Sequence, residues 1–488
     1  MSILQTRIEH DSLGEMTVPA EALYGASTAR AVLNFPISGL RADHSLLWAT
    51  LAIKKVAAHV NRALGQFERL QQQDPHAFHG LPANEVANSI QQAATEIMND
   101  LKNHAGLQYG KQFVVDVYQA GAGTSHNMNI NEVLANRAIE ILSGERGDRS
   151  LVDPNDHVNM GQSTNDVFPT AMRLAALQLL QELDPVLLRL EQAFAAKGDA
   201  FNEIVKSGRT HLQDAVPMRL GQEFAAWAIT TQRCRIRLQR AGEELQELGI
   251  GGNAIGTGIN TLPDFARLMA EGLAAETGLQ VRMGTNLIEL CQNTDAFVSV
   301  SAALRTLALD LTRIANDIRL LSSGPNTGLA EIVLPAVQPG SSIMPGKVNP
   351  SIPEMLNMVC FQVIGNDTTI AYACQAGQLE LNVMMPVMAY NLNQSLTILT
   401  NAISIFTTKC VDGITANAER CRAYLDHSLG LATVLNPLIG YIDAARVVKR
   451  AQSEGISIAQ VVLEEGLLTQ KAFDALIQTS LNHKQAPD

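Results

Sequence analysis

The sequence predicts an all-α, mainly helical fold built around a bundle of long helices. Four stretches carry this prediction, because each repeats apolar residues every three or four positions over an unusual length and holds few glycines. They cover residues 169–200, 222–248, 295–321 and 353–408. The composition agrees: hydrophobic residues make up 46% of the chain but aromatic residues only 5%, so the core must be built from aliphatic side chains and methionine, which suit packed helices.

The N-terminal part of the chain is more mixed. Residues 1–40 contain several prolines and glycines and are expected to form an irregular arm with short strands or turns. Apolar periodicity predicts one helix over about 45–64 and another over about 84–98, and the polar residues 65–85 are expected to form a loop. The Gly/Asn-rich segment 121–131 leads into a further predicted helix.

Polar loops are expected to separate the long helices. They cover residues 151–166, 208–217, 249–260 and 322–350. Two prolines, Pro185 and Pro386, are expected to kink or break the helices that contain them. The last 70 residues or so return to shorter helices, with breaks expected at Gly430, Pro437 and Gly440.

Bulk properties exclude several classes of protein. A length of 488 residues predicts two or three domains, and a net charge of −12 argues against a protein that coats nucleic acid. None of the six cysteines forms a CxxC pair, so we expect reduced, buried thiols rather than a disulfide framework or a metal site. We find no signal-peptide pattern and no apolar run of about 18 residues, which predicts a cytoplasmic protein without a membrane span.

The segment 340–350, Gly-Ser-Ser-Ile-Met-Pro-Gly-Lys-Val-Asn-Pro, concentrates groups that bind anions. Glycines let backbone N–H groups approach a ligand, and consecutive N–H groups can form an anion-binding nest. Lys347 adds a positive charge and Asn349 a neutral donor, beside the hydroxyls of Ser341 and Ser342. The alternative is a surface loop whose composition arose by chance.

A second polar segment, 208–214, places Thr210 and His211 in a turn ahead of a helix. An isolated histidine is more often structural than catalytic. A histidine titrates near neutral pH, however, so His211 could bind a carboxylate or move a proton.

A third segment, 161–166, presents Ser163, Thr164 and Asn165 at the entry to a long predicted helix. These residue types are favoured as N-caps, which explains them without a function. A helix N-terminus with side-chain hydroxyls is also an anion site, so both interpretations remain open.

The fourth segment, 121–129, contains Thr124 and either contacts a ligand or caps the next helix. The glycine-rich residues 249–260 suggest a dinucleotide-binding loop at first sight. They follow a helical pattern rather than a strand, so we reject that interpretation.

Together these segments resemble the aspartase/fumarase superfamily. GSSIMPGKVNP at 340–350 matches the superfamily signature in full, and the resemblance extends from RIEHDSLGEMTVP near the N-terminus to LNPLIGYIDAARVVKRA near the C-terminus. It implies three mainly helical domains, which we place at 1–160, 161–415 and 416–488. It also implies a homotetramer with a twenty-helix core, in which each active site gathers loops from three subunits. No cofactor is implied, and no cluster of metal ligands is apparent.

Within the superfamily, several residues favour the ammonia-lyase branch, which acts on L-aspartate. Gly123-Thr124-Ser125, Val216-Pro217-Met218 and Gly377-Gln378-Leu379-Glu380-Leu381-Asn382 resemble that branch rather than the class II fumarases. Asn326 and Met385 depart from the pattern of both branches. The alternatives are a class II fumarase acting on malate and an inactive scaffold of the same fold.

The resemblance also implies roles in an anti β-elimination that releases fumarate through an aci-carboxylate. Ser341 would be the general base, activated by nearby N–H groups and Lys347. The aci-carboxylate would be held by Ser163, Thr164, Ser342 and the N–H group of Ile343. The second carboxylate would be held by Thr210, His211, Lys347 and Asn349, with Glu354 setting the charge of His211. Thr124 and Asn165 would hold the leaving ammonium.

Overall fold

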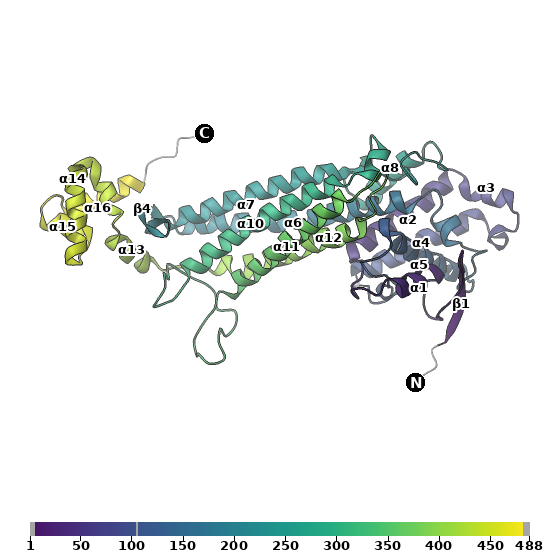
Figure 1. Cartoon of the computed structure of the whole chain (residues 1–488), viewed down its shortest axis with the longest axis horizontal. Helices are drawn as coiled ribbons and strands as arrows, with labels where there is room; N and C mark the ends of the chain where they lie inside the picture. Colours follow the sequence, from purple (N-terminus) through teal and green to yellow (C-terminus); the bar gives the residue numbers. More distant parts are fainter. Residues whose placement is uncertain (1–4, 104–105, 482–488) are drawn as a thin grey trace. The chain divides into compact units, whose positions relative to one another are not determined.

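A computed structural model describes residues 5–103 and 106–481, and it confirms the mainly helical fold (Figure 1). Five long helices dominate the chain. They are α6 (Thr164–Ala200), α7 (Leu220–Glu243), α10 (Asp295–Leu321), α11 (Ser351–Gln375) and α12 (Met385–Lys409). The described strands form only two-stranded pairs, so no sheet contributes a layer to the fold.

The chain forms two compact units, and each contains part of every long helix. Unit 1 comprises Met1–Leu183, Ile236–Thr306 and Gln362–Leu399; unit 2 comprises Asp184–Arg235, Leu307–Phe361 and Thr400–Asp488. The three predicted domains, with boundaries at 160 and 415, are continuous in sequence, whereas each unit is assembled from separated segments. Those boundaries therefore stay a prediction.

Unit 1 contains the N-terminal hairpin and most of the shorter helices. Its elements are β1 (Thr6–Asp11), β2 (Gly14–Pro19), α1 (Ala26–Asn34), α2 (His44–Ala63), α3 (Gln66–Gln73), α4 (Ala83–Asn103), α5 (Thr124–Ile141), β5 (Glu247–Leu248), α8 (Phe265–Thr277), β6 (Arg282–Met283) and α9 (Leu287–Gln292). Asp43 caps α2 by accepting hydrogen bonds from the N–H groups of Ser45 and Leu46, which explains why the helix begins there. Helices α2 and α4 pack together, and both contain fully buried aliphatic residues such as Leu51, Ile53 and Ile90.

Polar contacts also join the long helices within unit 1. Ser301 of α10 donates a hydrogen bond to Asp367 of α11 at 2.7 Å, and Asn366 donates to Ser395 of α12 at 3.0 Å. All four side chains are buried. Such bonds specify how the helices align, because a buried polar group without a partner is costly.

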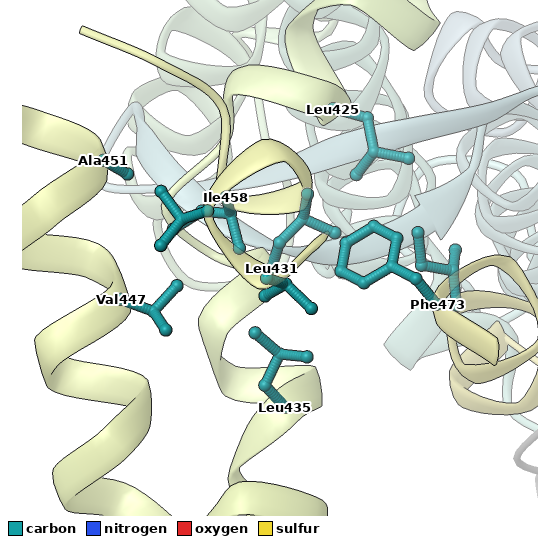
Figure 2. Close-up of a cluster of buried hydrophobic side chains, with 10 residues drawn as sticks. Leu425, Leu431, Leu435, Val447, Ala451, Ile458 and Phe473 are labelled. Carbon is teal, nitrogen blue, oxygen red and sulfur yellow. The ribbon is translucent and has the colours of Figure 1, made fainter. Parts of the chain in front are cut away.

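Unit 2 contains a hairpin and the C-terminal helices. Its elements are β3 (Val205–Thr210), β4 (Gln213–Arg219), β7 (Ile332–Val333), β8 (Thr415–Ala416), α13 (Ala418–His427), α14 (Leu431–Glu454), α15 (Ile458–Glu464) and α16 (Gln470–Leu481). Figure 2 shows Leu425, Leu431, Leu435 and Phe473 among the buried side chains through which the four C-terminal helices pack. A second, aromatic cluster joins Phe194, Phe224, Trp227 and Phe406 of α6, α7 and α12.

One stretch of the described chain, Ala418–Glu454, is long and apolar enough to cross a membrane by length and composition alone. A single stretch of this kind is weak evidence for a span. The stretch is interrupted between α13 and α14, and Gly440 leaves the helical conformation with φ 76°. The breaks predicted at Gly430 and Gly440 are therefore confirmed, whereas Pro437 lies inside α14.

Several local predictions were wrong for identifiable reasons. Residues 65–85 contain the helix α3, although most of its residues are polar. Its buried residue, Phe67, anchors the helix. Helix α5 begins at Thr124, before the Gly/Asn-rich segment ends, because its asparagines make tertiary bonds instead of turns. Residues 208–217 are part of the β3–β4 hairpin rather than a loop.

The two prolines also behave differently from the prediction. Helix α6 continues through Pro185, where the flanking Leu183 and Leu187 are buried and hold the helix in place. Pro386 is the second residue of α12, a position at which a helix needs no N–H donor.

Candidate active site

The start of α6 in unit 1 is organised by a capping box. The hydroxyl of Ser163 accepts a hydrogen bond from the N–H group of Asn165 at 3.2 Å, and the carboxylate of Asp166 accepts one from the N–H group of Ser163 at 2.9 Å. The two bonds are reciprocal and fix the first turn of the helix. The capping interpretation of residues 163–166 is therefore confirmed. Ser163, Thr164 and Asn165 are half-buried and remain accessible to a small ligand.

Asp166 connects this cap to the glycine-rich segment 249–260. Its second oxygen accepts hydrogen bonds from the N–H groups of Gly251 and Asn253 at 3.0 and 2.8 Å. Burial raises the pKa of Asp166 to about 6, against the opposing effect of these N–H groups and of Lys54. The glycine-rich segment is thus joined to the start of α6 by hydrogen bonds.

Helix α5 brings Thr124 to the same region of unit 1. Gly123, just before the helix, has φ +83°, and a Cβ atom there would lie 2.2 Å from the ring of Phe168 in α6. Only glycine allows the two helices to approach this closely. One turn into α5, the amide nitrogen of Asn127 lies 3.1 Å from the hydroxyl of Thr164. The structure therefore brings together the segments that contain Thr124 and Thr164.

A buried lysine lies behind these segments. Lys54 of α2 is fully buried, and its ammonium group donates hydrogen bonds to Asn159 at 2.7 Å and Gln162 at 3.1 Å. Burial lowers the pKa of Lys54 to about 7, although the charge of Asp166 acts in the opposite direction. Burial, with a contribution from Lys54, also lowers the pKa of His126 to about 3, so this histidine is neutral at physiological pH.

In unit 2, His211 occupies the tip of the β3–β4 hairpin. Thr210 pairs with Gln213, so His211 and Leu212 form a two-residue turn, and both have positive φ values of 56° and 60°. Two-residue hairpin turns require this conformation, which is unfavourable for residues other than glycine and asparagine. Thr210, His211 and Leu212 are all exposed. The strained turn presents the histidine ring away from the hairpin's own core.

A buried ionic cluster supports the base of this hairpin. Glu331 is fully buried and pairs with Lys206 at 2.6 Å and with Arg209 at 2.7 Å, both on β3. Lys206 also pairs with Glu223 of α7 at 2.9 Å. Burial raises the pKa of Glu223, against the opposing charge of Lys206. The charges are closely paired, as buried ions must be, and they anchor the strand that ends in Thr210 and His211.

The segment 340–350 is an exposed loop closed by its own backbone. The N–H group of Gly340 donates to the carbonyl of Lys347 at 2.9 Å, and the amide of Asn349 donates to the carbonyl of Gly340 at 2.7 Å. Inside the loop, the hydroxyl of Ser341 accepts hydrogen bonds from the N–H groups of Ile343 and Met344 at 3.2 and 3.1 Å. Two N–H donors stabilise a developing negative charge on that oxygen.

The remaining predicted residues of unit 2 are separate from these contacts. Glu354, in the first turn of α11, lies 4.0 Å from Arg319, and no described contact of this chain joins it to His211. Because the predicted site is shared between subunits, the pairing of Glu354 with His211 stays a prediction. Ser342, Ile343 and Lys347 are exposed in the loop.

The described residues contain no group of three or more His, Cys, Asp and Glu side chains that could hold a metal ion. Both units contain groups that can bind anions. Unit 1 contains a capped helix start with hydroxyls, and unit 2 contains a loop with backbone N–H groups and a lysine and, on the hairpin, a histidine; each of these features can bind an anion. A serine oxygen that receives two N–H bonds adds a candidate base.

Sequence reasoning missed Lys54, Asp166 and Glu331. A signal for Lys54 was available, because Leu47, Leu51, Lys54 and Ala58 follow helical spacing on the apolar face of α2, where a lysine is unexpected. No such signal marks Glu331, which lies in a stretch predicted to be a loop.

Comparisons with known proteins cover nearly the whole chain. A family model described as lyase matches residues 14–365, and a model described as fumarase C C-terminus matches residues 431–480. The aspartate ammonia-lyase of a Bacillus species is 45% identical over 96% of this chain and 96% of its own length. Aspartate ammonia-lyases of other bacteria are 44 to 46% identical over at least 96% of this chain.

Two solved structures share the fold. A structure described as fumarate lyase:delta crystallin from Brucella melitensis is 46% identical, with a TM-score of 0.89 over 97% of this chain and 98% of that chain. The class II fumarase of Schistosoma mansoni has the same TM-score of 0.89 over 98% of this chain and 100% of that chain, but its identity is 36%.

Proposed function

The chain belongs to the aspartase/fumarase superfamily of lyases, and we propose that it is an aspartate ammonia-lyase, which converts L-aspartate into fumarate and ammonia. The observation that carries this proposal is the identity of about 45% with aspartate ammonia-lyases along almost the entire chain, against 36% with a class II fumarase of the same fold. The activity is that of a carbon–nitrogen lyase.

The difficult step is removal of a Cβ proton beside a carboxylate. The negative charge moves into that carboxylate and forms an aci-carboxylate, which must meet donors that are already in place. Ser163 and Thr164 supply hydroxyls at the start of α6, where the helix dipole also favours negative charge. Ser342 and the N–H group of Ile343 complete the set of donors.

Ser341 acts as the general base. A free serine hydroxyl is a poor base, and the two N–H groups that bond its oxygen favour the alkoxide. In the reactive complex the N–H group of Ile343 must serve the substrate as well, so the loop has to adjust when substrate binds. Lys347 adds positive charge to the same loop.

Asn165 and Thr124 bind the leaving ammonium. The amide nitrogen of Asn165 donates to the carbonyl of Ala254 at 2.8 Å, so the side chain presents its amide oxygen, which is the acceptor that an ammonium needs. An ammonium leaves as neutral ammonia and needs no proton from an acid. This is the chemical difference from malate, whose hydroxide must be protonated.

The second carboxylate is bound by residues of unit 2. They are Thr210 and His211 of the hairpin tip and Lys347 and Asn349 of the serine loop, with Glu354 setting the charge of His211. The buried ion pairs of Lys206 and Arg209 with Glu331 support the hairpin and hold its tip in a defined direction.

We further propose a cytoplasmic homotetramer whose active sites are shared between subunits. Support comes from apolar side chains exposed on the long helices of unit 2. They include Leu309 (53%), Met358 (65%) and Phe361 (58%), which a partner subunit would cover. Sizing of the purified protein should give the mass of four chains of 52.6 kDa. A monomer at micromolar concentration would contradict the shared site.

The proposed reaction is tested with L-aspartate and L-malate separately, by following the ultraviolet absorbance of fumarate. Fumarate from aspartate alone supports the ammonia-lyase. Fumarate from malate alone would identify a class II fumarase. Activity on neither substrate would leave an inactive scaffold or another succinyl-type substrate.

A further inference from the structure

Three polar side chains of unit 1 form a hydrogen-bond chain that ends at the hydroxyl of Thr164: Lys54 and Asn127 are buried, and Asn159 is half-buried. The ammonium of Lys54 donates to the amide oxygen of Asn159 at 2.7 Å. The same oxygen accepts a hydrogen bond from the amide nitrogen of Asn127 at 3.2 Å. The nitrogen of Asn127 also donates to the hydroxyl oxygen of Thr164 at 3.1 Å. Asn127 is only 1% exposed, whereas its partners Asn159 and Thr164 are half-buried.

We propose that Asn127 is a positioning residue for the elimination: it donates to the Thr164 oxygen and thereby directs the Thr164 hydroxyl hydrogen toward the substrate carboxylate. This inference rests on the proposed function, in which Thr164 binds the carboxylate that becomes the aci-carboxylate. The residues predicted to contact substrate do not include Lys54, Asn159 or Asn127.

The direction of the chain is determined by the protein. The amide nitrogen of Asn159 donates to the carbonyl of Gln162 at 3.1 Å, while its oxygen faces the ammonium of Lys54. Turning the Asn159 amide over would place an oxygen against the Gln162 carbonyl, where neither atom can donate. Turning the Asn127 amide over would place its oxygen 3.2 Å from the oxygen of Asn159. One orientation of each amide therefore makes the bonds described, although the buried amide oxygen of Asn127 has no hydrogen-bond partner among the described residues.

The position of Thr164 in the helix removes the usual partner of a threonine hydrogen. Elsewhere in unit 1, the hydroxyls of Thr50 and Thr95 donate to the carbonyl four residues earlier, at 2.9 and 2.8 Å. Thr164 is the first residue of α6, so no preceding helical turn offers such a carbonyl. Within the described part of the chain, we find no protein acceptor for its hydrogen. A donor oriented in advance loses little energy to reorganisation in the transition state.

The test is a double-mutant cycle on kcat/KM for L-aspartate. Asn127→Asp keeps the shape but places an acceptor against Thr164, which must then turn its hydrogen away from the substrate. We expect kcat/KM at pH 8 to fall about 30-fold, with a similar fall in Thr164→Val. The double variant should be no more than about twofold worse than the poorer single variant, because both changes remove the same bond.

Lower pH provides a second readout. Protonation of the introduced carboxyl restores a donor, so the defect of Asn127→Asp should shrink as the pH falls, while that of Thr164→Val should not. Asn129→Asp is the matched control: Asn129 is buried on the same helix but bonds Val114 and Gln112, away from Thr164. It should change kcat/KM less than about threefold.

The proposal would be overturned if the losses of kcat/KM in Asn127→Asp and Thr164→Val multiplied in the double variant. It would also be overturned if Asn129→Asp lowered kcat/KM as much as Asn127→Asp does. If Asn127→Asp fails to fold, Asn127→Ala enters the same cycle, where independence from Thr164→Val would also overturn it. Wild-type protein that releases no fumarate, or Thr164→Val with unchanged kcat/KM, would instead contradict the proposed function.

Discussion

The start of α6 in unit 1 and the serine loop at 340–350 in unit 2 both present short hydroxyls, but they are held in different ways. At the start of α6, side chains make the structure: the buried Asp166 accepts hydrogen bonds from three N–H groups. The buried Asn127, linked to Lys54 through Asn159, donates to the hydroxyl of Thr164. In the serine loop, backbone groups of the loop itself bond Ser341, and Ile343 is 83% exposed.

The difference fits the roles proposed for the two segments. In the proposed mechanism the start of α6 binds the aci-carboxylate, and donors that need not move stabilise charge most effectively. The proposed base lies in an exposed loop, which can change conformation at low cost when substrate binds. Changes in the serine loop should therefore affect rate more than stability, and changes around α6 should affect both.

The largest expected effect is that of Ser341→Ala. Loss of the proposed base should lower kcat about 1,000-fold, while the midpoint of thermal unfolding stays within the range of a surface change, because the hydrogen bonds described for the Ser341 side chain lie within its own loop. Ser342→Ala, next to it, removes one donor and should lower kcat about tenfold. Near-normal turnover of Ser341→Ala, followed as fumarate release, would remove the proposed base.

A matched pair of glycines tests the structural side of the comparison. Gly123→Ala should destabilise the protein by about 3 kcal/mol or more, because the new methyl group meets Phe168 at a φ of +83°. Gly346→Ala in the serine loop has nearly the same φ, +81°, with nothing within 4 Å of the new carbon, and should cost only about 1 kcal/mol. If both variants lost the same free energy of unfolding, measured with denaturant, the serine loop would be as tightly packed as the start of α6.

The sequence predicted the long helices well because their apolar periodicity reflects burial directly. Helix α10 has the bounds that were predicted, Asp295–Leu321. The segments 161–166 and 340–350 could be recognised as candidates because small hydroxyls, glycine and asparagine are not needed for packing between helices. The family resemblance supplied the roles of their residues, which remain to be tested by mutation.

What the sequence did not predict depends on contacts between distant residues. The need for glycine at 123 arises from the ring of Phe168, and the base of the hairpin depends on Glu331, more than 100 residues away from β3 along the chain. Nothing in the local pattern of 205–219 distinguishes a hairpin from a polar loop, because the strands are paired to each other and alternate only weakly in burial.

The buried charge behind α6 should make stability depend on pH. The folded-state pKa of Lys54 is lowered to about 7 from an ordinary 10.5, so folding disfavours the charged amine. Its contribution to stability is fully present above pH 10.5 and is lost as the pH falls toward 7. The free energy of unfolding of wild-type protein relative to Lys54→Met should therefore rise by about 2 kcal/mol from pH 7 to 9.

Lys55→Met is the control for that measurement, since Lys55 pairs with Glu276 at 2.7 Å and is 24% exposed on the same helix. Its unfolding free energy should follow wild type across the same pH range. A flat difference between wild type and Lys54→Met would mean that the ammonium stays charged in the folded protein and that the helix start is better solvated than its packing indicates.

The smallest expected effect concerns the hairpin tip. Leu212 has a φ of +60° and is 71% exposed, so the turn carries backbone strain without burying its side chain within the chain. Leu212→Asn should stabilise the protein by about 0.5 kcal/mol, because asparagine tolerates the left-handed region. Thermal unfolding measures the change in stability, and sizing measures the oligomeric state of the variant. A loss of stability, or dissociation into smaller species, would mean that a partner subunit covers Leu212 in the assembly. The hairpin tip would then be held by packing against another subunit. Of the two exposed segments of unit 2, only the serine loop would then differ from the start of α6 in being held by its own backbone.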